Sequence, residues 1–351
     1  MKPAVSLCVV NYNGAKHLKR TLGALAAQSW VFDEVILIDN ASTDASVRLA
    51  RELLPGIVVV ELDRNLGPGA ARNAALVKAN NDLILFLDND VILQDDTAER
   101  LVTHLQTQSE ALLVAPRVEY DAQPGIIQYD SADCHFLGLM ATRNANMPAD
   151  KAPLDAVETN SLVTACFVID RRRLRNDVLF DETLGFNLED HDFGLRCRLS
   201  GHHLWALPSA RVRHSSGTPG LSYRPGGQSS DQRLFYLTRN RWLIVGKCFS
   251  VRTLFRLAPA LFVFELAQLV WLLASGRIGI WVRAMRSTFA RRTELCDQRR
   301  MVQSSRLVSD AEVLSDLPLP LTDQSRGSRL SKALLSVTDR TLRGYFRLVR
   351  L

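Results

Sequence analysis

The stretch Leu83-Ile84-Leu85-Phe86-Leu87-Asp88-Asn89-Asp90 runs from five apolar residues straight into two carboxylates. A continuous Leu, Ile and Phe run predicts a strand that is covered on both faces. Asp88 and Asp90 should therefore stand at its carboxyl end, the edge where open α/β sheets bind ligands. Residues i and i+2 of an extended segment point the same way, so both carboxylates could face one hard cation such as Mg²⁺ or Mn²⁺. The alternative is an ordinary turn, in which Asp and Asn are common.

Three strand-like segments precede this stretch, and each is followed by polar residues. They are residues 5–10, followed by Asn11-Tyr12-Asn13-Gly14; residues 35–38, followed by Asp39-Asn40-Ala41-Ser42-Thr43-Asp44; and residues 58–60, followed by Asn65-Leu66-Gly67-Pro68-Gly69. Between them, helices are expected over Leu18 to Ala26, over 45–54 with Ser42 or Thr43 as its cap, and over 70–78. This alternation predicts a doubly wound, mostly parallel α/β sheet with one crevice along the polar loops.

Downstream of Asp90 the pattern continues with less regularity. A helix is expected over 97–108, a strand over 112–116 and another strand over 162–169. Residues 120–160 are rich in Asp, Pro, Gly and Asn and are interpreted as long loops over the site. Gly67-x-Gly69 lacks the third glycine of a dinucleotide fingerprint, which disfavours a nicotinamide enzyme. These glycines either let the backbone approach a ligand or simply begin a helix.

A second acidic group lies in Leu188-Glu189-Asp190-His191-Asp192-Phe193-Gly194-Leu195. The apolar spacing predicts a helix over 188–199 with Glu189 and Asp190 in its first turn. Acids are favoured there by the helix dipole with or without catalysis, although three acids in four residues exceed what a cap requires. The histidines lack a zinc spacing, but His214 follows a strand-like segment and precedes a Gly, Ser and Pro-rich stretch (215–230) that is either a lid or a linker.

Charge and cysteine content limit the class of protein. The net charge is +6, with arginines concentrated in the second half, for example at Arg171-Arg172-Arg173 and Arg291-Arg292. This asymmetry favours an anionic partner, such as an acidic membrane leaflet, or else a solvated basic face. Nucleic-acid binding is disfavoured because the arginines lack interleaved aromatics and the crevice is acidic. The six scattered cysteines are typical of reduced cytosolic thiols, and residues 1–6 contain no signal-like segment.

Residues 257–276 form a twenty-residue apolar stretch that is bounded by Arg256 and Arg277. Its length permits a membrane span, but Glu265 and Gln268 would be costly in hydrocarbon. We therefore expect a helix lying in the membrane interface, with Arg277, Arg283 and Arg286 reaching anionic headgroups. A buried core helix is the alternative. The tail from 301 to 351 is expected to be irregular apart from an amphipathic segment near 330–342.

Taken together, the first 220 or so residues resemble the inverting family 2 glycosyltransferases with a GT-A fold, of the type that builds bacterial cell-surface polysaccharides. The resemblance rests on Val9-Val10-Asn11-Tyr12-Asn13, Asp39-Asn40-Ala41-Ser42-Thr43-Asp44, Asn65-Leu66-Gly67 with Ala71-Arg72-Asn73, Asp88-Asn89-Asp90, and Glu189-Asp190-His191-Asp192. The segment Tyr236 to Arg241 with the following apolar helices is similar to members that use lipid carriers. Ala74-Ala75 departs from the glycine that many members have after the asparagine. The resemblance implies a GT-A domain at 1–225, a helical membrane-interface region at 226–300 and a tail at 301–351.

The same resemblance implies a metal-dependent inverting glycosyltransferase at the cytoplasmic face of the plasma membrane. Its donor would be a nucleotide-diphosphate sugar, its acceptor a glycan or a polyprenol-linked glycan, and a rhamnosyltransferase is one candidate. The implied residue roles are the following: Asp190 as general base; Asn11, Asn13, Asp39, Asn65, Arg72 and Asp88 at the donor; and Asp90, Asp88 and His214 at an Mg²⁺ or Mn²⁺ ion.

Competing functions remain open on the sequence. A nucleotidyltransferase would need a Gly and Arg-rich triphosphate loop after the first strand, which Asn11-Tyr12-Asn13-Gly14 is not. A glycosidase would use paired carboxylates without a nucleotide. A non-catalytic, membrane-associated scaffold that retains a sugar-nucleotide-binding fold is the main alternative.

Overall fold

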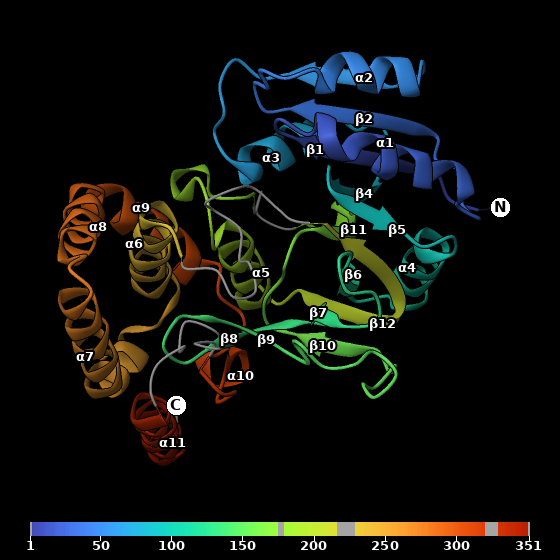
Figure 1. Cartoon of the computed structure of the whole chain (residues 1–351). Helices are drawn as coiled ribbons and strands as arrows, with labels where there is room; N and C mark the ends of the chain where they lie inside the picture. The colour runs from blue at the N-terminus through green and yellow to red at the C-terminus, as the bar shows by residue number, and fades with distance from the viewer. Residues whose placement is uncertain (1, 175–178, 216–228, 320–328, 350–351) are drawn as a thin grey trace. The chain divides into compact units, whose positions relative to one another are not determined.

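The computed structural model describes residues 2–174, 179–215, 229–319 and 329–349 (Figure 1). They form two compact units. The first comprises Met1–Ala132, Thr142–Gly194 and His202–Gly217, and the second comprises Asp133–Ala141, Leu195–Gly201 and Thr218–Leu351. The stretch interpreted as a lid or linker lies, from 216 to 228, outside the described residues.

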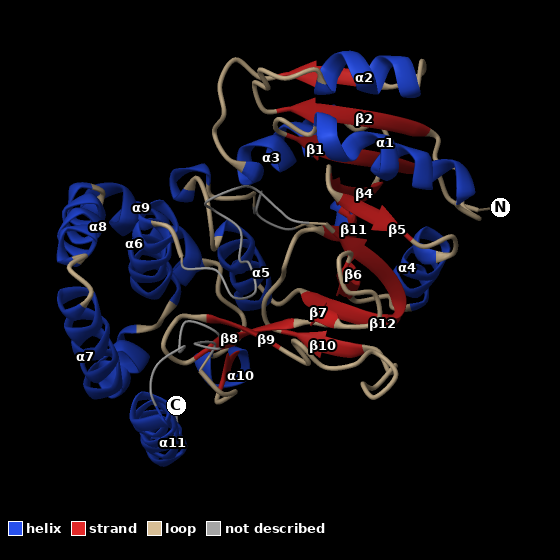
Figure 2. Ribbon diagram, in the orientation of Figure 1, coloured by secondary structure: helices blue, strands red, loops and turns tan. Residues whose placement is uncertain are grey.

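The first unit is built on one mixed sheet of ten strands (Figure 2). Its main order is β10-β12-β6-β11-β4-β1-β2-β3, with β5 beside β12 and β7 beside β6. The strands are β1 Val5–Asn11, β2 Glu34–Asp39, β3 Val58–Glu61, β4 Leu83–Asp88, β5 Val91–Leu93, β6 Ala111–Tyr120, β7 Ile127–Tyr129, β10 Val157–Thr159, β11 Cys166–Asp170 and β12 His203–His214. Strands β1 to β4 run parallel as expected, whereas β11 enters antiparallel to β4. The predicted α/β class is confirmed.

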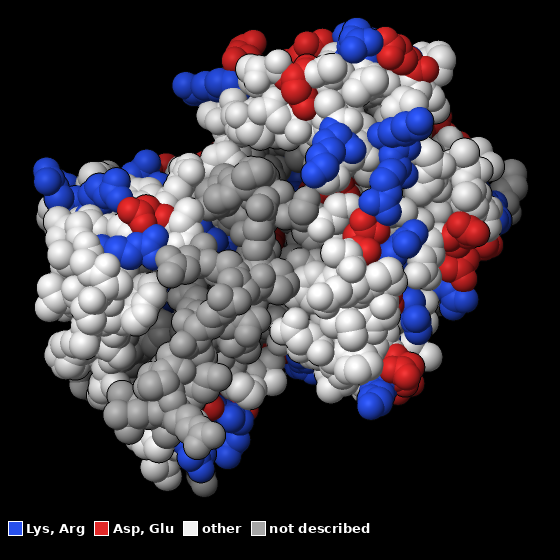
Figure 3. All heavy atoms as spheres, viewed as in Figure 1, with Lys and Arg blue, Asp and Glu red and all other residues white. Residues whose placement is uncertain are grey.

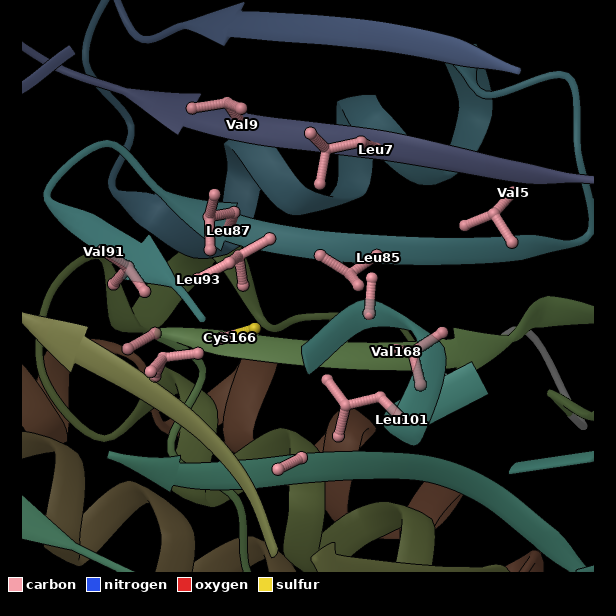
Figure 4. Close-up of a cluster of buried hydrophobic side chains, with 14 of the residues drawn as sticks. Val5, Leu7, Val9, Leu85, Leu87, Val91, Leu93, Leu101, Cys166 and Val168 are labelled. Atoms are coloured by element: carbon pink, nitrogen blue, oxygen red, sulfur yellow. The ribbon is translucent and has the colours of Figure 1, made fainter. Parts of the chain in front are cut away.

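Both faces of the central strands are buried, which explains their continuous apolar sequence. On one face, alternate residues Val5, Leu7 and Val9 of β1 pack with Leu85 and Leu87 of β4 (Figure 4). Helices α1 (Ala15–Gly23), α2 (Ser46–Leu53) and α4 (Thr97–Thr107) contribute side chains to this cluster. Helix α3 (Pro68–Lys78) contacts β1 and β2 without contributing to it, so α3 covers the opposite face.

Two local predictions are wrong. Neither Ser42 nor Thr43 caps α2: the residue before the helix is Ala45, and the Ser42 hydroxyl instead accepts a hydrogen bond from the Asn13 amide, 2.8 Å away. The strand expected over 162–169 begins only at Cys166, because the chain turns at Thr164 and Ala165.

The interpretation of residues 120–160 as long loops is also wrong. This region contains β7, β10, β8 (Ala132–His135) and β9 (Met140–Thr142). Each is three or four residues long, too short for a periodicity to be visible in sequence. These short strands are defined by pairing with distant strands: β7 pairs with β6, and β10 pairs with β12.

The second unit is mainly helical, with α6 Asp231–Cys248, α7 Val251–Ala274, α8 Ile278–Ala290, α9 Arg292–Ser304, α10 Asp310–Val313 and α11 Arg329–Val349. Helix α11 agrees with the amphipathic segment near 330–342, but the described part of the tail also contains other regular elements. Helix α9 extends into it, α10 follows, and β13 (Leu314–Ser315) pairs with β8. Helix α8 packs on α6, and α7 contacts α8 and α11.

Within the described part of the chain, α7 alone is long and apolar enough to cross a membrane. Only 28% of its most apolar window is buried, which argues against the core-helix alternative. The side chain of Glu265 does not point outward: Arg241 donates to its carboxylate, as do the indoles of Trp242 at 3.0 Å and Trp281 at 2.5 Å. Gln268 donates to the Thr238 hydroxyl at 2.9 Å. Both polar groups thus face the other helices of the unit.

Candidate active site

The polar loops predicted to share one crevice do meet at the carboxyl edge of the parallel strands. In the strand register Asn11 lies opposite Asp39, and Val10 lies opposite Asp88. The ends of β1, β2 and β4 are therefore level, and the residues that follow them share one edge.

Asn11 and Asp39 form the centre of a buried network between the first two loops. The side-chain Nδ2 of Asn11 donates to Asp39 Oδ1 at 2.6 Å and to Ser46 Oγ at 2.9 Å. The side-chain Oδ1 of Asn11 accepts from Asn89 Nδ2 at 2.8 Å. Asp39 Oδ2 accepts from the Ser42 amide, while Asn13 Oδ1 accepts from the Thr43 amide, each at 2.8 Å. Asn11 and Asp39 are almost fully buried, so they fix the shape of this edge from beneath.

Asn65 and Gly67 shape the third loop. Asn65 Oδ1 accepts from the Gly67 amide at 3.0 Å. Gly67 adopts φ +94°, and a Cβ there would lie 2.0 Å from the Gly185 carbonyl oxygen. Gly67 stands directly before α3, which begins at Pro68, so the structure agrees with the interpretation that these glycines begin a helix; the close contact of Gly67 is with the backbone of Gly185.

Arg72, on α3, connects the two acidic groups. Its guanidinium is 1% exposed and donates through Nη2 to Asp88 Oδ1 at 2.6 Å and to the Thr164 carbonyl at 3.0 Å. Nη1 lies 3.9 Å from Glu189 Oε1. Nε and Nη1 of Arg72 and Oε2 of Glu189 are buried without a hydrogen-bond partner among the described residues. Arg72 is thus placed between the two acids, and part of its hydrogen-bonding capacity is unused.

Asp190 opens α5 (Glu189–Leu199), as the sequence predicts. The two residues before the helix, Asn187 and Leu188, have positive φ values of 60° and 67°. Leu rarely adopts this region, and such strain is often found at functional sites. The turn directs Glu189 against Arg72 and leaves Asp190 half-buried, with one oxygen accepting from the His191 amide at 2.8 Å.

The electrostatics of these groups are coupled. Burial raises the pKa of Asp88 to about 6, although Arg72 opposes the shift and 30% of the side chain stays exposed. Burial and then the neighbouring Asp190 raise the pKa of Glu189 to about 8, and burial also raises that of Asp190. Carboxyls with raised pKa values in one place are a common property of catalytic sites.

Asp90 and His214 lie together. Asp90 is 5% exposed, and His214, the last residue of β12, places Nε2 3.2 Å from Asp90 Oδ1. Asp88 already accepts from Arg72, and no three His, Cys, Asp or Glu side chains of the described chain converge closely enough to bind a metal by themselves. Two converging protein donors still fit Mg²⁺ or Mn²⁺, which commonly complete their coordination with water and substrate phosphate.

Some contributions to this site were not foreseen. Gln128 of β7 lies 2.9 Å from His214 Nδ1, and β7 was itself missed. Asn73, part of the Ala71-Arg72-Asn73 motif, makes two hydrogen bonds to the backbone of Phe180: its Nδ2 donates to the Phe180 carbonyl, and its Oδ1 accepts from the Phe180 amide. Conversely, the basic cluster Arg171-Arg172-Arg173 has internal partners: Arg171 donates to Leu76 and Ala79 carbonyls at the end of α3. Arg172 stays 63% exposed but pairs with Asp170 at 2.9 Å, so the chain's own carboxylate offsets part of the charge of this cluster.

Known proteins with similar sequences or folds were compared with this chain. Residues 6–173 match the family model described as "Glycosyl transferase family 2". Succinoglycan biosynthesis protein ExoO of Rhizobium meliloti is 36% identical over 101 residues, which are 28% of this chain and 29% of that protein. Amylovoran biosynthesis glycosyltransferase AmsE of Erwinia amylovora is 23% identical over 73% of this chain and 94% of its own length. The chain thus matches less than a third of ExoO.

Among solved structures, Staphylococcus aureus TarS (residues 1–349) in complex with UDP-GlcNAc superposes with a TM-score of 0.54, at 16% identity, over 99% of this chain and 90% of that one. GalNAc-T7 with UDP, GalNAc and Mn²⁺ superposes with a TM-score of 0.53, at 17% identity, over 70% of this chain and 48% of that one. At these identities the likeness establishes the fold alone. It is the GT-A fold.

Proposed function

We propose, from the match of residues 6–173 to the glycosyl transferase family 2 model, that the protein moves a sugar from a nucleotide-diphosphate donor to a hydroxyl of a glycan or lipid-linked acceptor, with inversion, in cell-surface polysaccharide synthesis. The observation that carries the proposal is the meeting of two acidic groups at one sheet edge, with Arg72 between Asp88 and Glu189. The names of ExoO and AmsE support the polysaccharide setting.

In the proposed reaction, Asp190 accepts the proton of the acceptor hydroxyl as its oxygen attacks the anomeric carbon. The bond from that carbon to the diphosphate oxygen breaks, and the nucleoside diphosphate leaves from the opposite face. Asp90 and His214 would hold a divalent cation, whose charge offsets the negative charge of the leaving group. Arg72 keeps Asp88 in place beside them. A single displacement inverts the stereocentre.

We assign the nucleotide to the edge formed by Asn11, Asn13, Asp39 and Asn65. Asn11 binds Asp39, and Asn13 binds the backbone amide of Thr43, so the first two loops are tied together. Asn40 ties the second loop to the third, since it donates to the Gly67 carbonyl and accepts from the Leu66 amide. These contacts order the pocket before a ligand arrives. A preformed pocket loses less conformational entropy when it binds. Because Asn11 and Asp39 are buried and hydrogen-bonded to each other, we expect them to shape the pocket by holding the loops that line it.

We further propose that the helical region 226–300 rests on the cytoplasmic leaflet of the plasma membrane, with the glycosyltransferase domain at 1–225 and a tail at 301–351. Along α7 an exposed apolar stripe recurs at helical spacing, comprising Val251, Phe255, Phe262, Leu266, Val270 and Leu273. On the face seen in Figure 3, the described atoms over α7 are uncharged, while Lys and Arg gather where α8 meets α9. An apolar face with a basic border fits an anionic lipid surface.

The test is an activity assay with UDP-, GDP- and dTDP-linked sugars, dTDP-rhamnose included, and polyprenol-linked acceptors, with and without Mn²⁺. We expect one donor to release its nucleoside diphosphate only when acceptor and cation are both present, and the anomeric configuration of the product to be inverted by NMR. Retention of configuration would contradict the single displacement. The absence of turnover and of nucleotide binding across the panel would favour the scaffold instead.

A further inference from the structure

The far side of the His214 ring is held by a residue from a strand that the sequence does not reveal. Gln128 Oε1 lies 2.9 Å from His214 Nδ1, and His214 Nε2 lies 3.2 Å from Asp90 Oδ1. The three side chains therefore form a line, Gln128 to His214 to Asp90. Only 14% of the His214 side chain is exposed, so the contact with Gln128 is protected from solvent.

The backbone on both sides of this line is fixed. The Ser215 amide donates to the Asp90 carbonyl at 3.0 Å, and the Asp121 amide donates to the His214 carbonyl at 3.0 Å. In the sheet, His214 is in register with Val91 on one side and Tyr120 on the other. With the backbone held, the free choices left to His214 are its ring rotation and its tautomer.

Gln128 is placed to settle that choice. It belongs to β7, in which Ile127 and Tyr129 are buried while Gln128, between them, points the other way. Register with β6 brings Tyr129 opposite Val118, so β7 runs beside the strand that also pairs with His214. An amide oxygen can only accept a hydrogen bond, so Nδ1 must carry the proton in this contact.

We propose that Gln128 is a positioning residue that keeps a proton on Nδ1 of His214, so that Nε2, which contacts Asp90 Oδ1 here, supplies its lone pair when a divalent cation binds beside Asp90 and displaces the proton of that contact. The proposal rests on the metal-assisted function proposed above. An outer partner of this kind fixes both the ring orientation and the tautomer of a ligating histidine, and its loss typically weakens metal binding 10- to 100-fold. Without it, the ring can present N–H instead of a lone pair.

The experiment is a titration of the full chain with Mn²⁺, followed by electron paramagnetic resonance, alone and with UDP, GDP or dTDP. We compare the wild type with Gln128→Met, which keeps the length of the side chain and removes the acceptor, and with Gln128→Glu, which restores an acceptor. Gln123→Met, at an exposed position in the neighbouring turn, is the matched control. His214→Ala reports the loss of the ligand itself.

We expect the dissociation constant for Mn²⁺ to rise about 10- to 100-fold in Gln128→Met, and the nitrogen hyperfine coupling of bound Mn²⁺ to weaken. Gln128→Glu should stay close to the wild type, as should Gln123→Met, and the thermal midpoints of the metal-free proteins should agree. Wild-type affinity and coupling in Gln128→Met, with both lost in His214→Ala, would overturn the role of Gln128 and leave the metal site intact. Failure of the wild type to bind Mn²⁺ would overturn both.

Discussion

Two regions of this molecule bury a carboxylate against an arginine, and they differ at the carboxylate. In the helical unit, both oxygens of Glu265 accept hydrogen bonds, one from Arg241 and Trp242 and the other from Trp281, although Nε of Arg241 lacks a partner among the described residues. At the sheet edge, Arg72 reaches Asp88 but stays 3.9 Å from Glu189, and polar atoms of Arg72 and Glu189 lack partners in the described chain.

Under the proposed function, this difference separates a structural ion pair from a site for a ligand. A carboxylate with donors on both oxygens has little to gain from a further partner, whereas a buried polar atom without a partner costs about 1–3 kcal/mol until one arrives. The Glu265 cluster turns the polar groups of α7 inward. Close to Asp190, polar atoms of Arg72 and Glu189 stay available for further hydrogen bonds. Substitutions should therefore damage stability in the first region and function in the second.

The largest expected effect is on turnover. Asp190→Asn removes the proposed base, so the rate should fall about 10²- to 10⁴-fold. Donor binding should persist and the thermal midpoint should change little, because burial already disfavours the charged form of Asp190. Steady-state kinetics and a melting curve measure both. Near-normal turnover would show that the base lies elsewhere.

The second prediction concerns the ion pair of the helical unit. Glu265→Leu leaves the Arg241 guanidinium buried at 1% exposure without its partner, and the free energy of unfolding should fall by about 3–5 kcal/mol. The double variant Arg241→Met/Glu265→Leu should recover most of that loss. Urea unfolding measures both, with Glu52→Leu at an exposed pair as the control, where a change below about 1 kcal/mol is expected. A small effect of Glu265→Leu would remove the contrast between the two regions.

The outer face of α7 comes third. Phe262→Ser, at a position 68% exposed, should lower partitioning onto vesicles of anionic phospholipid about 10- to 100-fold without lowering stability. The estimate follows from about 1.5–3 kcal/mol for burying one such side chain. Val77→Ser, at an apolar residue 83% exposed in the other unit, is the control for sedimentation with vesicles. Equal partitioning of wild type and Phe262→Ser would exclude this face from the membrane contact.

The smallest expected change, counted per pH unit, is in the pH dependence of stability. Glu189 has a folded pKa of about 8 against an ordinary value of 4.5, so between these pH values the folded protein holds a proton that the unfolded chain releases. Stability should then fall as pH rises through this window, by about 1.4 kcal/mol per pH unit. Glu189→Gln should flatten the slope, most visibly at pH 8, whereas exposed Glu294→Gln should not. Thermal midpoints at pH 5, 6.5 and 8 decide this, and parallel curves would contradict it.

The sequence predicts those parts of the fold and of the site that one continuous segment of the chain encodes. The residues from Leu83 to Asp90 predict a buried strand with acids at its end, and the structure contains β4 at Leu83–Asp88. The apolar stretch of α7 was equally visible. In both cases a single continuous segment carries the information.

The rest depends on partners far away in the chain. No residue close to Glu265 in sequence indicates that Arg241 and Trp281 will bind its carboxylate. From the sequence alone, Glu265 is a charged residue in an apolar helix. Gln128 was missed because β7 has three residues and exists through its pairing with β6. Arg171 looked like a surface charge, yet it binds carbonyls that lie more than ninety residues away in sequence. Tertiary partners of this kind leave no periodic signal.

The central claim, that the sheet edge is a metal-assisted donor site, is tested most directly by a thermal-shift panel. Wild type and Asp90→Ala are melted with UDP, GDP and dTDP, each with and without Mn²⁺. A nucleotide at a hundred times its dissociation constant adds about 2.7 kcal/mol of stability, which moves the midpoint by a few degrees. We predict a Mn²⁺-dependent shift for one nucleotide that Asp90→Ala abolishes. An equal shift in Asp90→Ala, or no shift with any nucleotide, would contradict it.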